Sequence, residues 1–290
     1  MEILIAKSSG FCFGVKRAIN MAQECADEKN EEIYTLGPII HNPQVVKKLE
    51  RSNIVPRDEV SDIDKGTVIV RSHGITLQET EEIERKGLNM VDATCPFVTK
   101  AHEILSHLCE EGYSVIIVGE KEHPEVKGII SYGSGDVTVA ASADEIRDMP
   151  MKGRLGIVAQ TTQSMSNLQE IVTLCLTKCT ELRVFNTICN ATTIRQGDSS
   201  NLAGQVDCMV VVGGRNSANT NRLAEMCRAL QPRTHHVEVA SEVDADWFDG
   251  ASRVGITAGA STPDWIINEV VALVKEVGDR RGERCRCAEV

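Results

Sequence analysis

Residues 92–97, Asp-Ala-Thr-Cys-Pro-Phe, lead from a short apolar segment into a long segment with helical periodicity. Two other stretches have the same character: residues 8–14, Ser-Ser-Gly-Phe-Cys-Phe-Gly, and residues 186–191, Asn-Thr-Ile-Cys-Asn-Ala. Their cysteines, Cys12, Cys95 and Cys189, lie too far apart for a local Cys-x-x-Cys site. Each stands where a strand is predicted to run into a helix, and each opens a new third of the chain.

Short apolar strands alternate with longer helical segments along the whole sequence. This order is typical of βαβ units and predicts an α/β fold with mostly parallel sheets. Residues 68–73, 156–161 and 255–260 occupy equivalent places in three successive repeats. The repeat is longer than the units of solenoid proteins, so we expect three related α/β domains rather than a stack.

The expected domains are residues 13–95, 96–189 and 190–280, followed by a flexible tail at 281–290. The first two repeats each end in a strand that leads to a cysteine, whereas the third has no such strand. Residues 1–12 contain an unassigned strand that leads to Cys12. We therefore expect this strand to complete the third sheet, which would arrange the domains as a ring with the three cysteines at its centre.

The composition excludes several classes of protein. Acidic residues outnumber basic ones, 42 against 31, and aromatic residues make up only 3% of the chain. Nucleic-acid-binding surfaces need the opposite balance, because lysine and arginine contact phosphates and aromatic rings stack on bases. We also find no apolar run that could span a bilayer and no secretory signal. The sequence predicts a cytoplasmic protein with no nucleic-acid partner and no membrane segment.

Eleven cysteines in such a chain predict free thiols or metal ligands rather than disulfides. Most free cysteines are small apolar core residues, and we expect this for most of the other eight. The three junction cysteines differ because a thiolate at a helix start is stabilised by unpaired backbone N–H groups. Three converging thiolates would leave one corner of an iron–sulfur cluster, or one position on a metal ion, open for chemistry. Basic residues follow each cysteine and would favour the thiolate: Lys16 and Arg17, Lys100, and Arg195.

Polar turns follow several predicted strands, and loops at the carboxyl ends of parallel strands are where ligands bind. These turns carry imidazoles, hydroxyls and amides: His41, His73, His123 with Glu125, Thr161 or Thr162, Ser217 with Asn219, and Ser261. Such donors suit a diphosphate. The other histidines, His102, His107, His235 and His236, are expected to be ordinary surface or core residues. We find neither a Walker-type loop nor a dinucleotide fingerprint, so nothing indicates a nucleotide.

Glu125 follows His123 by two residues, and two interpretations of it are open. A carboxylate at this position can simply cap the helix that begins at Pro124. A buried carboxylic acid can instead donate a proton to a developing negative oxygen. For the second role we expect the proton to pass through a hydrogen bond with Thr161.

Taken together, eight stretches closely resemble the 4-hydroxy-3-methylbut-2-enyl diphosphate reductases, iron–sulfur enzymes of the non-mevalonate isoprenoid pathway. The resemblance extends in order to about Val277. The stretches are Phe-Cys-Phe-Gly-Val (11–15), Gly-Pro-Ile-Ile-His-Asn (37–42), Arg-Ser-His-Gly (71–74), Asp-Ala-Thr-Cys-Pro (92–96), His-Pro-Glu-Val (123–126), Gln-Thr-Thr (160–162), Thr-Ile-Cys (187–189) and Gly-Ala-Ser-Thr-Pro (259–263).

The resemblance implies a [4Fe–4S] cluster held by Cys12, Cys95 and Cys189, with the fourth iron acting as a Lewis acid on the substrate hydroxyl. Electrons would come singly from a ferredoxin or flavodoxin, and the products would be isopentenyl and dimethylallyl diphosphate. It further implies that Glu125 supplies protons, that Thr161 orients the leaving hydroxyl, and that His123 relays a proton. The residues implied to hold the diphosphate are His41, His73, His123, Ser217, Asn219 and Ser261.

The sequence departs from this pattern at two places. Ala218 stands where many relatives have a second serine, and Cys285 and Cys287 lie in a basic tail outside the shared pattern.

Two other functions remain open. A non-redox hydro-lyase could also use a three-cysteine cluster on a hydroxyl, and a sugar-phosphate-binding module would need no cluster.

Overall fold

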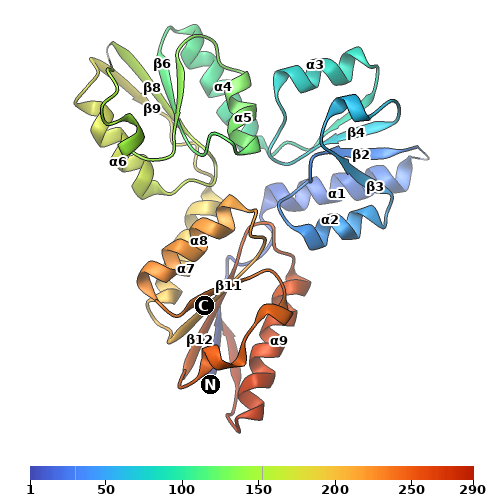
Figure 1. The fold of residues 1–290 in the computed structure, drawn as a ribbon, viewed down its shortest axis with the longest axis vertical. Coiled ribbons are helices and arrows are strands. Elements are labelled where there is room, and N and C mark those ends of the chain that lie inside the picture. The colour runs from blue at the N-terminus through green and yellow to red at the C-terminus, as the bar shows by residue number, and fades with distance from the viewer. Residues whose placement is uncertain (30, 152) are drawn as a thin grey trace. The chain divides into compact units, whose positions relative to one another are not determined.

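The computed structural model describes residues 1–29, 31–151 and 153–290 and contains three β-sheets with helices on their faces (Figure 1). The chain divides into two compact units. Unit 1 comprises Met1–Phe13, His41–Val45 and Asn190–Val290, and it contains sheet A. Unit 2 comprises Gly14–Ile40 and Val46–Cys189, and it contains sheets B and C.

Sheet A has the strand order β11-β10-β12-β1-β13. Its strands are β1 (Glu2–Ile5), β10 (Cys208–Val212), β11 (Thr234–Val237), β12 (Arg253–Ala258) and β13 (Arg286–Glu289). Helix α9 (Asp264–Arg280) packs on one face, and α7 (Asn190–Ala203) and α8 (Ala218–Leu230) pack on the other. Both faces are therefore covered, as expected for a parallel sheet.

Sheets B and C have the orders β3-β2-β4-β5 and β7-β6-β8-β9. The strands of sheet B are β2 (Ile33–Leu36), β3 (Ile54–Arg57), β4 (Thr67–Val70) and β5 (Asn89–Asp92), and its helices are α1 (Phe13–Glu28), α2 (Pro43–Glu50) and α3 (Leu77–Arg85). The strands of sheet C are β6 (Ser114–Val118), β7 (Val137–Ala140), β8 (Arg154–Ala159) and β9 (Glu181–Val184), and its helices are α4 (Pro96–Glu110), α5 (Pro124–Ser131) and α6 (Met165–Leu176).

The same four-strand order recurs in all three sheets, and every pairing among the described strands is parallel. In sheet A the fourth place belongs to β1, which pairs with β12 from Glu2 opposite Arg253 to Ile5 opposite Ile256. The predicted class, three related α/β domains with parallel sheets, is confirmed.

The end of the chain differs from the expected flexible tail. Strand β13 pairs in parallel with β1, from Glu2 opposite Arg286 to Ile5 opposite Glu289. Val290 N donates to the Ile5 carbonyl at 2.9 Å, and Lys7 N donates to the Val290 carbonyl at 3.0 Å. The free edge of β1 gives this segment its hydrogen bonds, although its own side chains are exposed and supply no apolar pattern.

Several cysteines outside the three junctions are core residues, as expected. Cys175, Cys208 and Cys227 are fully buried among aliphatic side chains. Burial raises the pKa of Cys175 and Cys208 to about 11 and that of Cys227 to about 12, so these thiols stay protonated at neutral pH. They contribute to packing and not to ligation.

Helix α7 forms even though its sequence is largely polar. Its buried face includes Ser199, whose hydroxyl lies 2.7 Å from the Thr257 hydroxyl of strand β12. Leu202 and Ala203 complete the contact with sheet A. A satisfied hydroxyl pair thus takes the place of an apolar contact.

Within the described ranges, no helix is long and apolar enough to cross a membrane.

Because β1 lies between β12 and β13, its core side chain Ile3, which is 0% exposed, should matter for stability. We expect Ile3→Ala to lower the free energy of unfolding by about 2–4 kcal/mol through lost burial and the cavity left behind. Leu176→Ala, at a 66% exposed position, is the control and should change it little. Equal urea unfolding midpoints for the two variants would contradict the central place of β1.

Candidate functional site

In unit 2, a buried carboxylate and a threonine form a closed pair. Glu125, the second residue of α5, is 1% exposed, and Thr161, which follows β8, is 6% exposed. Thr161 donates its backbone N–H to Glu125 Oε1 at 2.6 Å and its hydroxyl to Glu125 Oε2 at 2.9 Å. Of the two interpretations of Glu125, a solvated helix cap is wrong. The side chain is buried and bonds Thr161, at the end of β8.

His123 is the N-cap of α5, and its Nδ1 accepts the backbone N–H of Glu125 at 3.1 Å. A neutral ring that accepts at Nδ1 carries its hydrogen on Nε2, so that atom can donate to a ligand. The His73 ring meets the His123 ring edge to face, with centroids 5.7 Å apart. Two of the three predicted strand-end histidines are therefore neighbours in unit 2.

Gln160 holds the neighbouring turns together and is fully buried. Its Oε1 accepts the Glu120 N–H at 3.1 Å, and its Nε2 donates to the Thr162 hydroxyl at 3.1 Å. The Thr162 hydroxyl accepts from this amide, while the Thr161 hydroxyl donates to Glu125. The two predicted threonines thus have different partners.

Cys95 is the N-cap of α4, with Pro96 at the first helical position. Its N–H donates to the Ser72 carbonyl at 3.0 Å, which fixes the cysteine beside the turn that carries His73. A Cβ at Gly14 would come within 2.6 Å of Cys95 Sγ, so only glycine fits against this sulfur. Arg17 Nη1 donates to the Thr94 carbonyl at 3.0 Å and steadies the same loop.

Cys189 ends unit 2 and is half-buried. Its N–H donates to the Thr161 carbonyl at 3.0 Å, so the cysteine is tied to the residue that bonds Glu125. Thr187, two residues earlier, receives the Ala159 N–H at 2.8 Å, which extends the hydrogen bonding of β8. The loop therefore continues the edge of sheet C.

In unit 1, the turns after β10 and β12 meet the segment that contains His41. The Ser261 hydroxyl donates to the His41 carbonyl at 3.1 Å, and a Cβ at Gly214 would come within 2.7 Å of that carbonyl. Ser217 is the N-cap of α8, and its hydroxyl accepts the Thr220 N–H at 3.3 Å. Asn219 lies one residue into the first turn and is 6% exposed.

Some buried polar atoms of unit 1 have no hydrogen-bond partner among the described residues. They include Asn219 Nδ2, Asn42 Nδ2, Gln44 Oε1 and the hydroxyls of Ser8 and Ser9. Asn42 is 1% exposed, and its Oδ1 caps α2 by accepting the Val45 N–H at 3.0 Å. Leaving a buried polar atom unsatisfied is costly, so each of these atoms is a candidate for contact with a polar ligand. In the sequence Asn42 ends the stretch 37–42, and nothing there indicates that its amide donor is buried.

Cys12 follows β1 in unit 1, and its N–H donates to the Ala260 carbonyl at 3.2 Å. Arg195, which is 3% exposed, donates from Nη2 to the Gly10 carbonyl at 2.7 Å. Lys100 was expected to favour the thiolate of Cys95, but it is exposed and forms an ion pair with Glu103 at 3.1 Å. The two residues are three positions apart on α4, a spacing at which helical side chains are neighbours.

Among the residues that the structure describes, no three histidine, cysteine or acidic side chains are arranged to hold a metal ion. The three-cysteine ligand set therefore stays a prediction.

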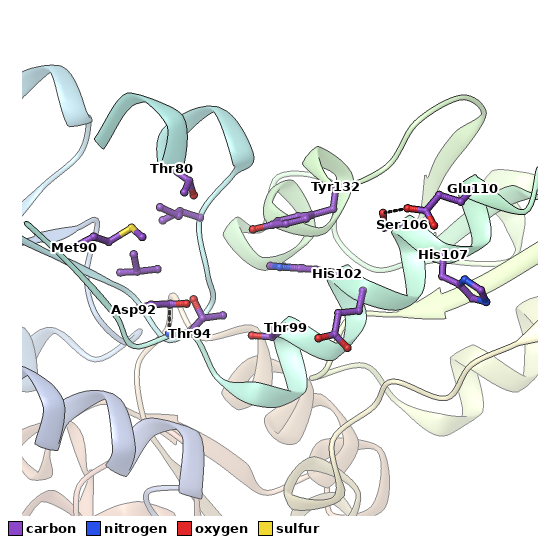
Figure 2. A pocket seen from close by; sticks show the side chains of 13 residues that line it. Thr80, Met90, Asp92, Thr94, Thr99, His102, Ser106, His107, Glu110 and Tyr132 are labelled. Atoms are coloured by element: carbon purple, nitrogen blue, oxygen red, sulfur yellow. Dashed lines mark hydrogen bonds between the residues drawn. The ribbon is translucent and has the colours of Figure 1, made fainter. Parts of the chain in front are cut away.

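Unit 2 also contains a cavity of about 440 Å³ between sheet B and helices α4 and α5 (Figure 2). Met90, Asp92, His102 and Tyr132 are among the residues that line it.

The family model for the LytB protein matches residues 3–275. The 4-hydroxy-3-methylbut-2-enyl diphosphate reductase of Geotalea uraniireducens is 54% identical over 277 residues, covering 96% of this chain and 98% of the relative. The reductase of the same name from Geobacter metallireducens is 55% identical, also over 277 residues, with the same coverage.

Two solved structures are similar as well. The structure of (E)-4-hydroxy-3-methyl-but-2-enyl diphosphate reductase, described as the terminal enzyme of the non-mevalonate pathway, is 45% identical with a TM-score of 0.70, covering 95% of this chain and 99% of that one. The E-1-hydroxy-2-methyl-but-2-enyl-4-diphosphate reductase of Plasmodium falciparum is 28% identical with a TM-score of 0.92, covering 100% and 92%. With matches of this length and identity, the chain belongs to the LytB family, the family of the 4-hydroxy-3-methylbut-2-enyl diphosphate reductases.

Proposed function

We propose that this enzyme reduces 4-hydroxy-3-methylbut-2-enyl diphosphate to isopentenyl and dimethylallyl diphosphate. The substrate takes up two electrons and two protons, its C–O bond to the hydroxyl breaks, and one water leaves. The observation that carries the proposal is the buried Glu125–Thr161 pair, a proton source and a hydroxyl at the ends of neighbouring strands. The reductases to which the chain is similar act on this substrate by name.

The residues that would hold the [4Fe–4S] cluster are Cys12, Cys95 and Cys189. The fit of Cys95 is supported by Gly14, where any side chain would collide with the sulfur, and Gly14 follows Cys12 by only two residues in the chain. Backbone hydrogen bonds fix the loops of all three cysteines. When bound, the cluster would supply the electrons and an open iron as a Lewis acid. A ferredoxin or flavodoxin in the cytoplasm would deliver those electrons one at a time.

The diphosphate would be held by neutral donors rather than by lysine or arginine. The proposed residues are His41, His73, His123, Ser217, Asn219 and Ser261. Asn219 supports this role best, because its buried Nδ2 has no hydrogen-bond partner in the described part of the protein. It also lies in the first turn of α8, where backbone N–H groups and the helix dipole favour an anion. Ala218 offers its backbone N–H at the same helix end, in place of a second serine hydroxyl.

Protonation would begin at Glu125 and pass through the Thr161 hydroxyl, which already bonds Glu125 Oε2. Thr161 would also orient the leaving hydroxyl. The His123 Nε2 hydrogen would face the diphosphate and could be exchanged with it, because Nδ1 is occupied by the Glu125 N–H. Proton supply and diphosphate binding would thus share one turn, residues 123–125.

The experiment that tests this function is anaerobic reconstitution with iron and sulfide. We expect about four irons per chain and turnover of the substrate only when a low-potential electron donor is present. Mössbauer spectra should show one iron site that changes when substrate is added. Turnover without electrons would identify a hydro-lyase instead, and colourless protein without iron or sulfide would indicate a sugar-phosphate-binding module.

Glu125→Gln should retain cluster content and substrate affinity but lower kcat by about 100-fold or more, because the amide cannot donate an acidic proton. The amide oxygen can still accept the Thr161 N–H, so the fold should be unchanged. Glu122→Gln is the matched control, since Glu122 lies in the same turn but points outward to Lys127 at 2.8 Å. Full activity of Glu125→Gln would reject the proton-donor role.

Asn219→Ala should raise KM for the diphosphate substrate by about 10-fold with little change in kcat, because a hydrogen bond to a charged group is lost. Asn221→Ala is the control on the same helix, because the Asn221 amide is already bonded to the Arg215 carbonyl at 2.8 Å. Steady-state kinetics of the two variants give the KM and kcat that are to be compared. An unchanged KM for Asn219→Ala would remove this residue from the diphosphate site.

A further inference from the structure

His102 is a core histidine that the proposed chemistry does not use. It lies on α4, seven residues after Cys95, and is only 5% exposed. Its ring stacks on Tyr132, the C-cap of α5, with centroids 4.3 Å apart and planes inclined by 18°. Figure 2 shows the Tyr132 ring stacked above the His102 ring, and both residues line the cavity.

The edge of the His102 ring contacts two glycines. A Cβ at Gly74 would lie 3.2 Å from His102 Cε1, and a Cβ at Gly128 would lie 3.4 Å from His102 Nε2. Gly74 directly follows His73, with a φ of +77° that suits glycine. Gly128 lies on α5, the helix that begins after His123. The ring therefore stands between the backbone that carries one histidine and the backbone that carries the other.

A second link holds the same two segments. Leu77, the first residue of α3, donates its N–H to the Ser131 hydroxyl at 3.0 Å, and that hydroxyl donates to the Gly128 carbonyl at 2.7 Å. This link lies beyond the His73 turn and fixes α3 to α5. The turn itself is tied to its own sheet by the Ser72 hydroxyl, which donates to the Ile39 carbonyl at 3.1 Å, and to the Cys95 loop by the Cys95 N–H, which donates to the Ser72 carbonyl at 3.0 Å. Neither of these bonds reaches α5, whereas the His102 ring contacts both the turn and that helix.

The ring acts through its shape rather than through charge. Burial lowers the pKa of His102 to about 4, so the ring is neutral at neutral pH. Its Nε2 is inaccessible and has no hydrogen-bond partner within the described part of the chain. The adjoining cavity of about 440 Å³, lined by Val70, Ile75 and Met90, offers space into which an unsupported turn could move.

We propose that His102 is a positioning residue, whose ring, kept flat by Tyr132, sets the distance between the His73 turn and helix α5. It thereby sets the spacing of His73 and His123, whose ring centroids are 5.7 Å apart. This inference rests on the proposed function in so far as both histidines bind diphosphate. A small displacement of such groups weakens binding strongly.

His102→Ala should raise KM for the substrate, and the Kd for inorganic pyrophosphate by calorimetry, each by about 10-fold. His102→Phe restores a flat ring and should stay within about 2-fold of the wild type. Leu108→Ala is the matched control, since Leu108 is a fully buried residue of α4 that packs on Gly156 of β8, away from the His73 turn. It should lower the melting temperature comparably and leave both constants unchanged. If His102→Ala is insoluble, Tyr132→Leu, which removes the stacked ring, replaces it.

Equal values of KM and of the pyrophosphate Kd for His102→Ala and Leu108→Ala would overturn the inference. So would a His102→Phe variant that binds as weakly as His102→Ala. If the wild type itself neither turns over nor binds pyrophosphate, the proposed function fails, and the side-chain NMR signals of His73 and His123 then test the inference alone. Both signals should shift in His102→Ala and not in Leu108→Ala. Unshifted signals would overturn it.

Discussion

Parallel pairing of the strands is the constraint on which the rest of the structure depends, because it places all carboxyl ends of a sheet at one edge. The three sheets use this edge in the same way. The two central strands lead to the proposed substrate residues, such as His73 after β4 and Thr161 after β8. The fourth strand leads to a cysteine: Cys95 after β5, Cys189 after β9 and Cys12 after β1. Position in the sheet thus separates the proposed substrate residues from the proposed cluster ligands.

Two of the cysteine loops are further held by arginines from the first two turns of the helices that follow other cysteines. Arg17, soon after Cys12, binds the carbonyl before Cys95, and Arg195, soon after Cys189, binds the carbonyl of Gly10. A guanidinium is well suited to this task because it stays charged and offers several donors in one plane. Lys100 instead pairs with Glu103 on its own helix. The loops of Cys12 and Cys95 are therefore each held by an arginine, whereas, within the described part of the chain, the helix after Cys95 supplies no such contact to the Cys189 loop through Lys100.

Much of this could be predicted from the sequence, because strand ends are marked by glycine, proline and polar residues. The order of elements even placed β1 in the third sheet, since a strand was missing there. The tail could not be predicted, because Arg286–Glu289 forms a strand only by binding the edge of β1. Nor could the environment of His102, since its contacts with Gly74 and Gly128 depend on tertiary packing and leave no periodic pattern.

The placement of β1 has a consequence for how the protein is made. Residue 2 leaves the ribosome 251 residues before residue 253, its partner in β12. At common translation rates, the first strand waits on the order of 10–50 seconds without a sheet to join. The Cys12 loop takes up its hydrogen bond with Ala260 only afterwards. A cluster that uses Cys12 with its loop in this conformation would therefore be inserted only after β12 and the turn that contains Ala260 have been synthesised.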